Sequence, residues 1–288
     1  MHYAIMRETN NSMNIFRIIW RTIKGMGTLN SGQLASSLSF NVFFTIAPII
    51  FLSLAVAGLI IDIGSFQEYL IVTVKSYTSP EVTSFFTSLL ETMTNQSVNI
   101  SAIIVGSGTV FLGLMGVTSS IMTIFHDVWH DPDDDTLLDS VKRSMVAYAV
   151  IVILGFLLLG TMVVSAMIEV SLHYFNSYIP FGSFILAYTN VVLILVILFA
   201  LFALLFKFSP PKIVPWNHVI FPALVTSVLI YFVRYVLEIY FGYGGFSSVY
   251  GAASTLVIVL VWIQTQGYII IFGAKMSEVS YKLSKQKK

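Results

Sequence analysis

The stretch that decides the fold is residues 184–206, FILAYTNVVLILVILFALFALLF, in which no residue is charged. A helix needs about 20 mostly apolar residues to cross the hydrocarbon core of a membrane, so this stretch predicts a transmembrane helix. Transmembrane β-strands would instead give alternating segments of about ten residues, a pattern that the sequence lacks. Five further stretches meet the helical criterion, and we predict a span in each: about 39–61, 100–125, 145–168, 217–239 and 251–274.

The composition agrees with a protein that crosses the membrane several times. Of the 288 residues, 57% are apolar and only 10% are charged, whereas a soluble domain carries about 25% charged residues. The 15 basic and 14 acidic residues nearly balance, which argues against nucleic acid as a partner, because a nucleic-acid-binding surface needs a basic excess. Cysteine is absent from the sequence, which excludes disulfides, thiolate metal sites and cysteine nucleophiles.

The distribution of positive charge predicts how the six spans are oriented. Thirteen of the 15 basic residues lie before the first span or after the second, fourth or sixth, and therefore on one side of the membrane. Basic residues accumulate in cytoplasmic loops. We therefore predict an all-α bundle of six transmembrane helices with both termini in the cytoplasm. Its parts are a cytoplasmic N-terminus at 1–38, a single transmembrane domain at 39–279 and a basic tail at 280–288.

The N-terminal segment 14–24 is predicted to be an amphipathic helix. Its apolar side chains recur at helical spacing, and Arg17, Arg21 and Lys24 occupy one flank. This pattern is typical of a helix that lies on the inner leaflet with its cations at anionic headgroups. A charge cluster that only sets the topology is the alternative interpretation.

Residues 62–98 are too polar to cross the membrane. Ser79, Pro80 and Glu81 form a helix start, with an N-cap residue, a proline at the first helical position and an early acid. We expect a pair of short extracytoplasmic helices here, packed against the outer ends of the bundle. An apolar stripe follows the helix start at helical spacing, formed by Val82, Phe85, Phe86, Leu89, Leu90 and Met93.

The second predicted span carries a column of small residues. Small residues let the backbones of two membrane helices approach closely, so helix packing is the favoured interpretation. The alternative is that this smooth face lines a path through the bundle. Spacings of three, four, three and four positions put all five members on one helix face: Gly106, Thr109, Gly113, Gly116 and Ser120.

Ionisable side chains within the spans are the stronger functional signal, because they are costly in lipid and usually face the protein interior or a water-filled cavity. Arg234 and Glu238 lie four residues apart on the fifth span and share a face. Glu169 and Asn190, on or near the third and fourth spans, are expected at a similar depth. We predict that these four residues form an outward-opening polar cluster that suits an anionic headgroup, an ion or a proton. The alternative is a structural ion pair, or side chains that extend to the interface.

The sequence contains no motif for catalysis or for a cofactor. The run from His126 to Asp135 holds histidine and carboxylate groups, but it lacks the spacing of a calcium loop and is interpreted as a solvated turn, so we predict no metal site. A phosphate-binding loop, a Gly-x-Ser-x-Gly elbow and a His-Glu-x-x-His pair are all missing from the sequence. We therefore expect a protein that is not an enzyme.

Three further segments occur in a characteristic order. The first span combines Ser36, Ser37 and Phe40 with a late proline, Pro48, and a Pro/Lys/Trp connector occupies residues 210–216. The chain ends with Tyr240, Tyr250, Gly251, Trp262, Gly273 and Ala274. Together these residues resemble the YihY/BrkB family of bacterial inner-membrane proteins over residues 12–280. One departure is that the family tends to carry an acid directly after the last Gly-Ala, where this chain has Lys275 and, one turn later, Glu278.

The resemblance implies six helices in the bacterial inner (plasma) membrane, with both termini inside. Some members of the family are labelled virulence factors. The family has also carried a ribonuclease label, which these residues do not support, because the sequence has no large basic surface for RNA. We expect a protein that transports or binds a small-molecule, ion or lipid-like substrate, with membrane lipids as partners. The alternative is a non-transporting scaffold in envelope maintenance.

Overall fold

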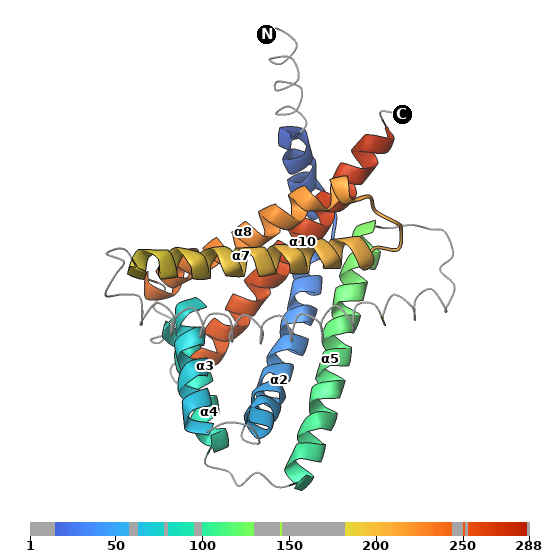
Figure 1. The fold of residues 1–288 in the computed structure, drawn as a ribbon. Coiled ribbons are helices and arrows are strands. Elements are labelled where there is room, and N and C mark those ends of the chain that lie inside the picture. The colour runs from blue at the N-terminus through green and yellow to red at the C-terminus, as the bar shows by residue number, and fades with distance from the viewer. Residues whose placement is uncertain are drawn as a thin grey trace. The chain divides into compact units, whose positions relative to one another are not determined.

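The computed structural model describes residues 15–57, 63–77, 80–94, 100–129, 145, 182–243, 250 and 253–286, and most of these are helical, with turns at 27–30 and an irregular connector at 209–215. Turns and short 3₁₀ helices connect the α-helices, and these residues contain no strand (Figure 1). Residues 15–26 form the first helical segment. The longer elements are α2 (Ser31–Ala57), α3 (Ile63–Tyr77), α4 (Pro80–Thr94), α5 (Ile100–Trp129), α7 (Gly182–Phe208), η1 (Trp216–His218), α8 (Ile220–Tyr243) and α10 (Ser254–Lys285).

Five of these helical stretches are long and apolar enough to cross a membrane. They correspond to the first, second, fourth, fifth and sixth predicted spans. The third predicted span, 145–168, lies outside the described residues apart from Met145. The five stretches are Ser31–Ile50, Ile104–Trp129, Val191–Phe208, Trp216–Phe241 and Ser254–Lys285.

Helices α2 and α10 extend furthest beyond the predicted ends of their spans. α2 begins at Ser31 rather than near residue 39, although its first turns are rich in serine. The serines there have polar partners on other helices: Ser37 Oγ lies 3.3 Å from Ser120 Oγ of α5, and Ser36 Oγ accepts a 2.9 Å hydrogen bond from Gln264 Nε2 of α10. α10 continues past residue 274 to Lys285, where paired charges replace the apolar side chains. Apolar run length therefore underestimated both helices.

The chain forms two compact units. Unit 1 consists of Met1–Gly25, Phe125–Val228 and Gly273–Lys288, and unit 2 consists of Met26–Ile124 and Leu229–Phe272. Helices α5, α8 and α10 contribute residues to both units. The predicted division at residues 38 and 279 stays a prediction.

The predicted pair of short helices is present in unit 2. α3 and α4 contact each other, and both contact α2. The apolar stripe of α4 forms its buried face: Val82 and Leu90 are fully enclosed, and Phe85 and Phe86 pack against a core that includes Leu237 of α8. Burial of this stripe fixes the rotation of α4 and turns its polar face away from the core.

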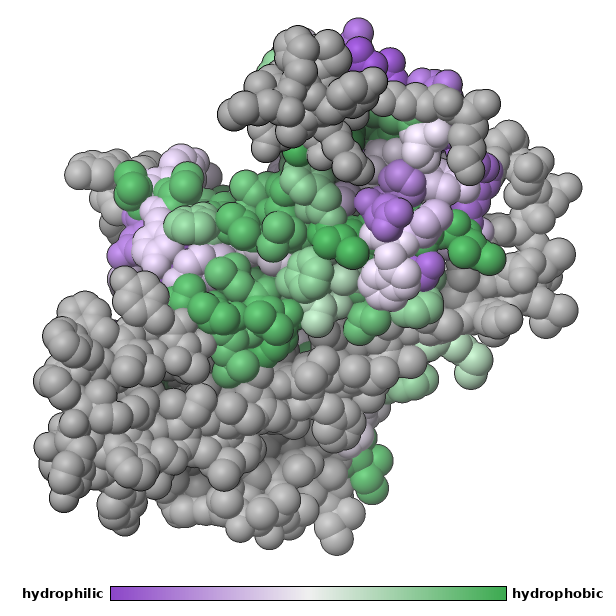
Figure 2. Space-filling model, turned by 45° about the horizontal axis from the view of Figure 1, so that its top comes forward, coloured by the Kyte–Doolittle hydropathy of each residue, from purple (hydrophilic) through white to green (hydrophobic). Residues whose placement is uncertain are grey.

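Large apolar side chains are also exposed along the long helices. A water-soluble surface rarely shows such continuous apolar area, and a membrane-spanning helix requires it. Figure 2 shows apolar side chains gathered over the drawn face. Examples of exposed apolar residues are Phe111, Leu112, Val192, Phe232, Val236 and Ile239.

Candidate functional site

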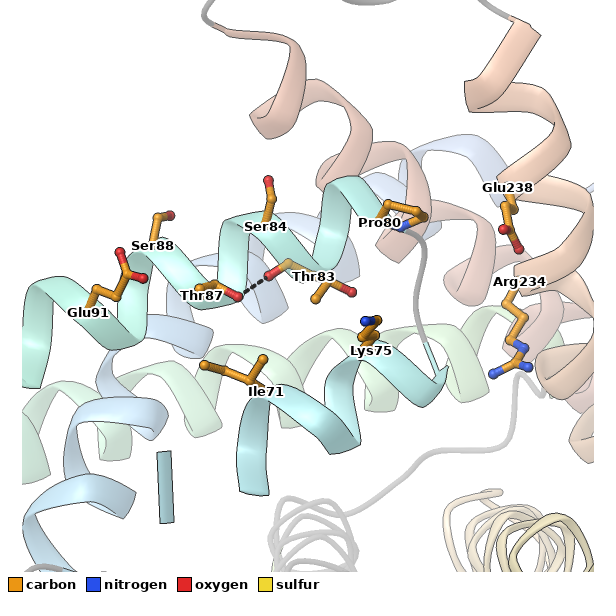
Figure 3. A pocket seen from close by; sticks show the side chains of 10 residues that line it. All are labelled: Ile71, Lys75, Pro80, Thr83, Ser84, Thr87, Ser88, Glu91, Arg234 and Glu238. Atoms are coloured by element: carbon orange, nitrogen blue, oxygen red, sulfur yellow. Dashed lines mark hydrogen bonds between the residues drawn. The ribbon is translucent and has the colours of Figure 1, made fainter. Parts of the chain in front are cut away.

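A cavity of about 750 Å³ lies in unit 2, and we call it the α3–α4–α8 cavity. Its walls carry hydroxyl, ammonium, guanidinium and carboxylate groups from three helices (Figure 3). The lining residues are Ile71 and Lys75 of α3, Pro80, Thr83, Ser84, Thr87, Ser88 and Glu91 of α4, and Arg234 and Glu238 of α8.

The polar wall of the cavity follows from the rotation of α4. Thr83, Thr87 and Glu91 recur every four residues and therefore follow one line along the helix. This line differs from the buried stripe. In Figure 3 the side chains of Thr83 and Thr87 point toward Lys75 of α3.

The hydroxyl groups of α4 point their hydrogens at the helix backbone. Thr87 donates to the Thr83 carbonyl at 3.0 Å, and Ser88 donates to the Phe85 carbonyl at 2.8 Å. Ser84 donates to the Glu81 carbonyl at 3.2 Å. With their hydrogens used in this way, these hydroxyl oxygens keep lone pairs that can accept a hydrogen bond.

Arg234 is positioned by two neighbouring tyrosines. Its guanidinium carbon lies 4.4 Å from the centre of the Tyr235 ring and 5.5 Å from that of Tyr231. Its Nη2 also donates a hydrogen bond of 2.7 Å to the Tyr235 hydroxyl. A planar guanidinium held on aromatic faces is pre-oriented, which favours binding of an anion such as phosphate.

The structure brings together two of the four residues of the predicted polar cluster. Arg234 and Glu238 both line the α3–α4–α8 cavity. Asn190 lies on α7, but its side chain is outside the described part of the chain, and Glu169 lies outside it altogether.

Sequence reasoning missed Lys75 and the hydroxyl-bearing face of α4. Lys75 carried a usable signal, because it is the one basic residue of the sequence in a loop predicted to face outward. The hydroxyls were harder to identify, since serine and threonine on a short polar helix are equally compatible with a face exposed to water.

The small-residue column of α5 meets α2 over its last three members. A β-carbon at Gly116 would lie 2.7 Å from Asn41 Oδ1, and one at Gly113 would collide with Thr45. Ser120 Oγ accepts a 2.7 Å hydrogen bond from Asn41 Nδ2. The backbones of α2 and α5 therefore approach closely along this seam.

The first two members of the column have different surroundings. Gly106 is half-buried and Thr109 is exposed. The Thr109 hydroxyl donates to the Val105 carbonyl of its own helix at 2.9 Å.

A buried carboxylate in unit 1 was also missed. The Glu278 side chain is 3% exposed and lies between two lysines of α10, with Lys275 Nζ at 2.8 Å and Lys282 Nζ at 2.5 Å. This is the acid that follows the position at which the chain departs from the YihY/BrkB pattern. Its burial was not evident from the sequence, because it lies beyond the predicted end of the last span.

The acidic run does not form a metal site within the described residues, in which no group of three or more His, Cys, Asp or Glu could hold an ion. His126 Nδ1 lies 3.5 Å from Asp127 Oδ1. The remainder of the run, from His130 to Asp135, is outside the described residues.

Comparison with known proteins identifies the family. The family model for virulence factor BrkB matches residues 22–288. A UPF0761 membrane protein of Pasteurella multocida is 30% identical, with 70% of this chain and 61% of the relative covered. One of Chromobacterium violaceum is 26% identical, with coverage of 89% and 60%, and one of Aggregatibacter aphrophilus is 23% identical, with 88% of both covered.

The chain thus spans about three fifths of the length of the first two relatives. No solved structure matches it. Both of these relatives are named as membrane proteins. The family match covers nearly the whole chain, and it agrees with the helices of membrane-spanning length. The protein is therefore a membrane protein that belongs to the virulence factor BrkB family.

Proposed function

We propose that the α3–α4–α8 cavity binds the polar head of a lipid-like solute and that the protein moves this solute across the membrane. The observation that carries the proposal is the cavity itself, in which Lys75, Arg234, Glu91 and Glu238 surround a volume of about 750 Å³. A charged group that remains in or near a membrane span is usually tied to a substrate or ion path.

The lining of the cavity suits a polar head with several groups better than a bare ion. Lys75 and Arg234 can bind an anionic group, Glu238 can bind a cationic one, and the hydroxyls of α4 can accept hydrogen bonds. A bare ion would use only one sign of charge, whereas the polar head of a lipid-like solute can use both.

The proposal includes a topology. We infer six spans with both termini in the cytoplasm of a bacterium, so that α3, α4 and the cavity face the extracytoplasmic side of the inner membrane. The support is the charge distribution, with 13 of 15 basic residues on the other side. Lys75 and Arg234 are the exceptions, and both line the cavity.

The transport proposal is tested with Arg234→Gln in liposomes that contain the full chain. The measurement is the rate at which a fluorescent phospholipid moves between leaflets. A hydrogen bond to a charged group contributes about 1.5–3 kcal/mol, so we expect the rate to fall at least about tenfold. Lys212→Gln removes an exposed charge outside the cavity and is the matched control.

Two results would count against this function. Equal rates for the wild type and Arg234→Gln would show that the cavity is not on the path. Liposomes with the wild-type chain that behave like empty liposomes would favour the non-transporting scaffold.

We also propose that residues 15–26 lie at the inner membrane surface. Phe16, Trp20 and Ile23 are exposed, at 72%, 62% and 55% of their surface, whereas Thr22 is fully buried in unit 1. Gly25 lies against Lys275 of the same unit. The helix is thus held by one face, and its free apolar face, flanked by cations, fits a bilayer interface.

This placement predicts how single spin labels respond in lipid nanodiscs. The sequence contains no cysteine, so Phe16→Cys and Arg21→Cys can each be labelled alone. The label at residue 16 is expected to be more accessible to oxygen than to a water-soluble nickel complex, because it lies in the acyl region, and the label at residue 21 is expected to show the reverse. The same aqueous accessibility at both positions would show that the helix stands away from the bilayer.

A further inference from the structure

The α3–α4–α8 cavity separates hydrogen-bond donors from acceptors. Lys75 and Arg234 are donors only. The hydroxyls of Ser84, Thr87 and Ser88 donate to backbone carbonyls and therefore offer acceptor oxygens. A complementary ligand must bring an anionic acceptor for the cations and N–H or O–H donors for the wall of α4.

The formal charges of the cavity add the second constraint. The lining carries two cations, Lys75 and Arg234, and two carboxylates, Glu91 and Glu238, and Glu238 lies one helical turn from Arg234. A purely anionic ligand at Arg234 would satisfy the cations but would place negative charge beside Glu238. A ligand with both signs of charge satisfies Arg234, Lys75 and Glu238 together.

We propose that the cavity selects a zwitterionic headgroup in which a phosphodiester is joined to a primary ammonium, as in phosphatidylethanolamine. This inference rests on the proposed function and narrows the class of solute. The phosphate lies at Arg234 and Lys75, where the stacked guanidinium can bind its oxygens in a bidentate manner. The ammonium lies at Glu238 and donates hydrogen bonds to its carboxylate.

The spacing along α8 fits this assignment. Arg234 and Glu238 are one helical turn apart, about 6 Å along the axis, which one headgroup can bridge. Glu91 lies at the opposite end of α4 from Pro80 (Figure 3), about 16 Å along that axis. Glu91 is therefore too far from Arg234 for an ammonium whose phosphate is bound there.

The chemistry excludes two common alternatives. A trimethylammonium headgroup, as in phosphatidylcholine, carries positive charge but has no N–H to donate to the Glu238 carboxylate. A glycerol headgroup has hydroxyl donors but leaves the lipid with a net negative charge and gives Glu238 no cationic partner. The cavity should therefore rank ethanolamine above both choline and glycerol.

The test measures binding of short-chain lipids to the purified full chain by native mass spectrometry. We expect dihexanoyl phosphatidylethanolamine to bind about tenfold more tightly than the choline or glycerol lipid. Arg234→Gln should weaken the ethanolamine and choline lipids alike, since both contain the phosphate. Glu238→Gln should weaken ethanolamine binding more than choline binding, because only the primary ammonium donates hydrogen bonds to the carboxylate, while Glu68→Gln, at an exposed position of α3 outside the cavity lining, is the matched control and should preserve the preference.

Other binding results would contradict either the headgroup inference, the proposed function or both. Equal or stronger binding of the glycerol or choline lipid, with Arg234→Gln still weakening it, would overturn the headgroup inference and leave the proposed function standing. If every lipid binds the Arg234→Gln variant as tightly as the wild type, both the headgroup inference and the proposed function are overturned. Equally tight binding of water-soluble glycerophosphoethanolamine would support the headgroup chemistry and contradict a lipid-like solute.

Discussion

Replacing Gly113 with valine is expected to push α2 away from α5 and to lower the stability of the protein markedly. A β-carbon at residue 113 would collide with Oγ1 of Thr45 and lie 2.8 Å from its Cγ2. Thr45 is 2% exposed and its hydroxyl is bonded to the Asn41 carbonyl at 2.6 Å, so it has little freedom to move. Overpacking of this kind costs about 1–3 kcal/mol.

Gly108→Val supplies the matched control on the same helix. A β-carbon at Gly108 would meet no described atom within 4 Å, so the larger side chain should be accommodated without a shift of α5. The measurement is the midpoint of thermal unfolding in detergent for both variants. Equal midpoints for the two variants would contradict the close approach of α2 and α5 at Gly113.

Replacing Glu278 with alanine is expected to produce the larger loss of stability. Its carboxylate is almost fully enclosed, and Lys275, its partner at 2.8 Å, is itself only 15% exposed. Removing one partner of a buried ion pair leaves an uncompensated charge, which costs about 3–5 kcal/mol. Lys282 is 57% exposed, so Lys282→Gln should cost no more than about 1 kcal/mol.

A double variant separates the cost of an unpaired charge from a general disruption of α10. Lys275→Met combined with Glu278→Leu removes both charges and keeps apolar volume, so we expect it to recover most of the stability that Glu278→Ala loses. The measurement is denaturant unfolding of the full chain followed by helical circular dichroism. A double variant as unstable as Glu278→Ala would show that the ion pair is not the origin of the loss.

Much of the fold could be predicted from the sequence because lipid leaves few alternatives. A run of about 20 apolar residues has to be a helix, since its backbone polar groups must be satisfied within the segment. The apolar stripe of α4 was predicted from helical spacing instead, and two of its members, Val82 and Leu90, are fully enclosed in the structure. Apolar run length did not predict that α2 begins at Ser31, because its first turns carry polar serines whose partners lie on other helices.

The candidate site was only partly predictable for a related reason. Arg234 and Glu238 were conspicuous because charge is rare within a span. The contribution of Lys75 and Thr87 depends on how α3 and α4 are rotated against α8, which tertiary packing decides. Burial of Glu278 likewise depends on neighbouring segments rather than on its own sequence context.

The most direct test of the central claim is to determine on which side of the membrane the cavity opens, by labelling single cysteines from outside. Ser84→Cys would place a single thiol on the exposed cavity wall of α4, and Lys285→Cys would place one on the exposed last turn of α10. In intact spheroplasts a membrane-impermeant maleimide should label residue 84 at once and residue 285 only after permeabilisation. Labelling of residue 285 in the intact cells, with residue 84 protected, would contradict an outward-opening cavity and the function proposed for it.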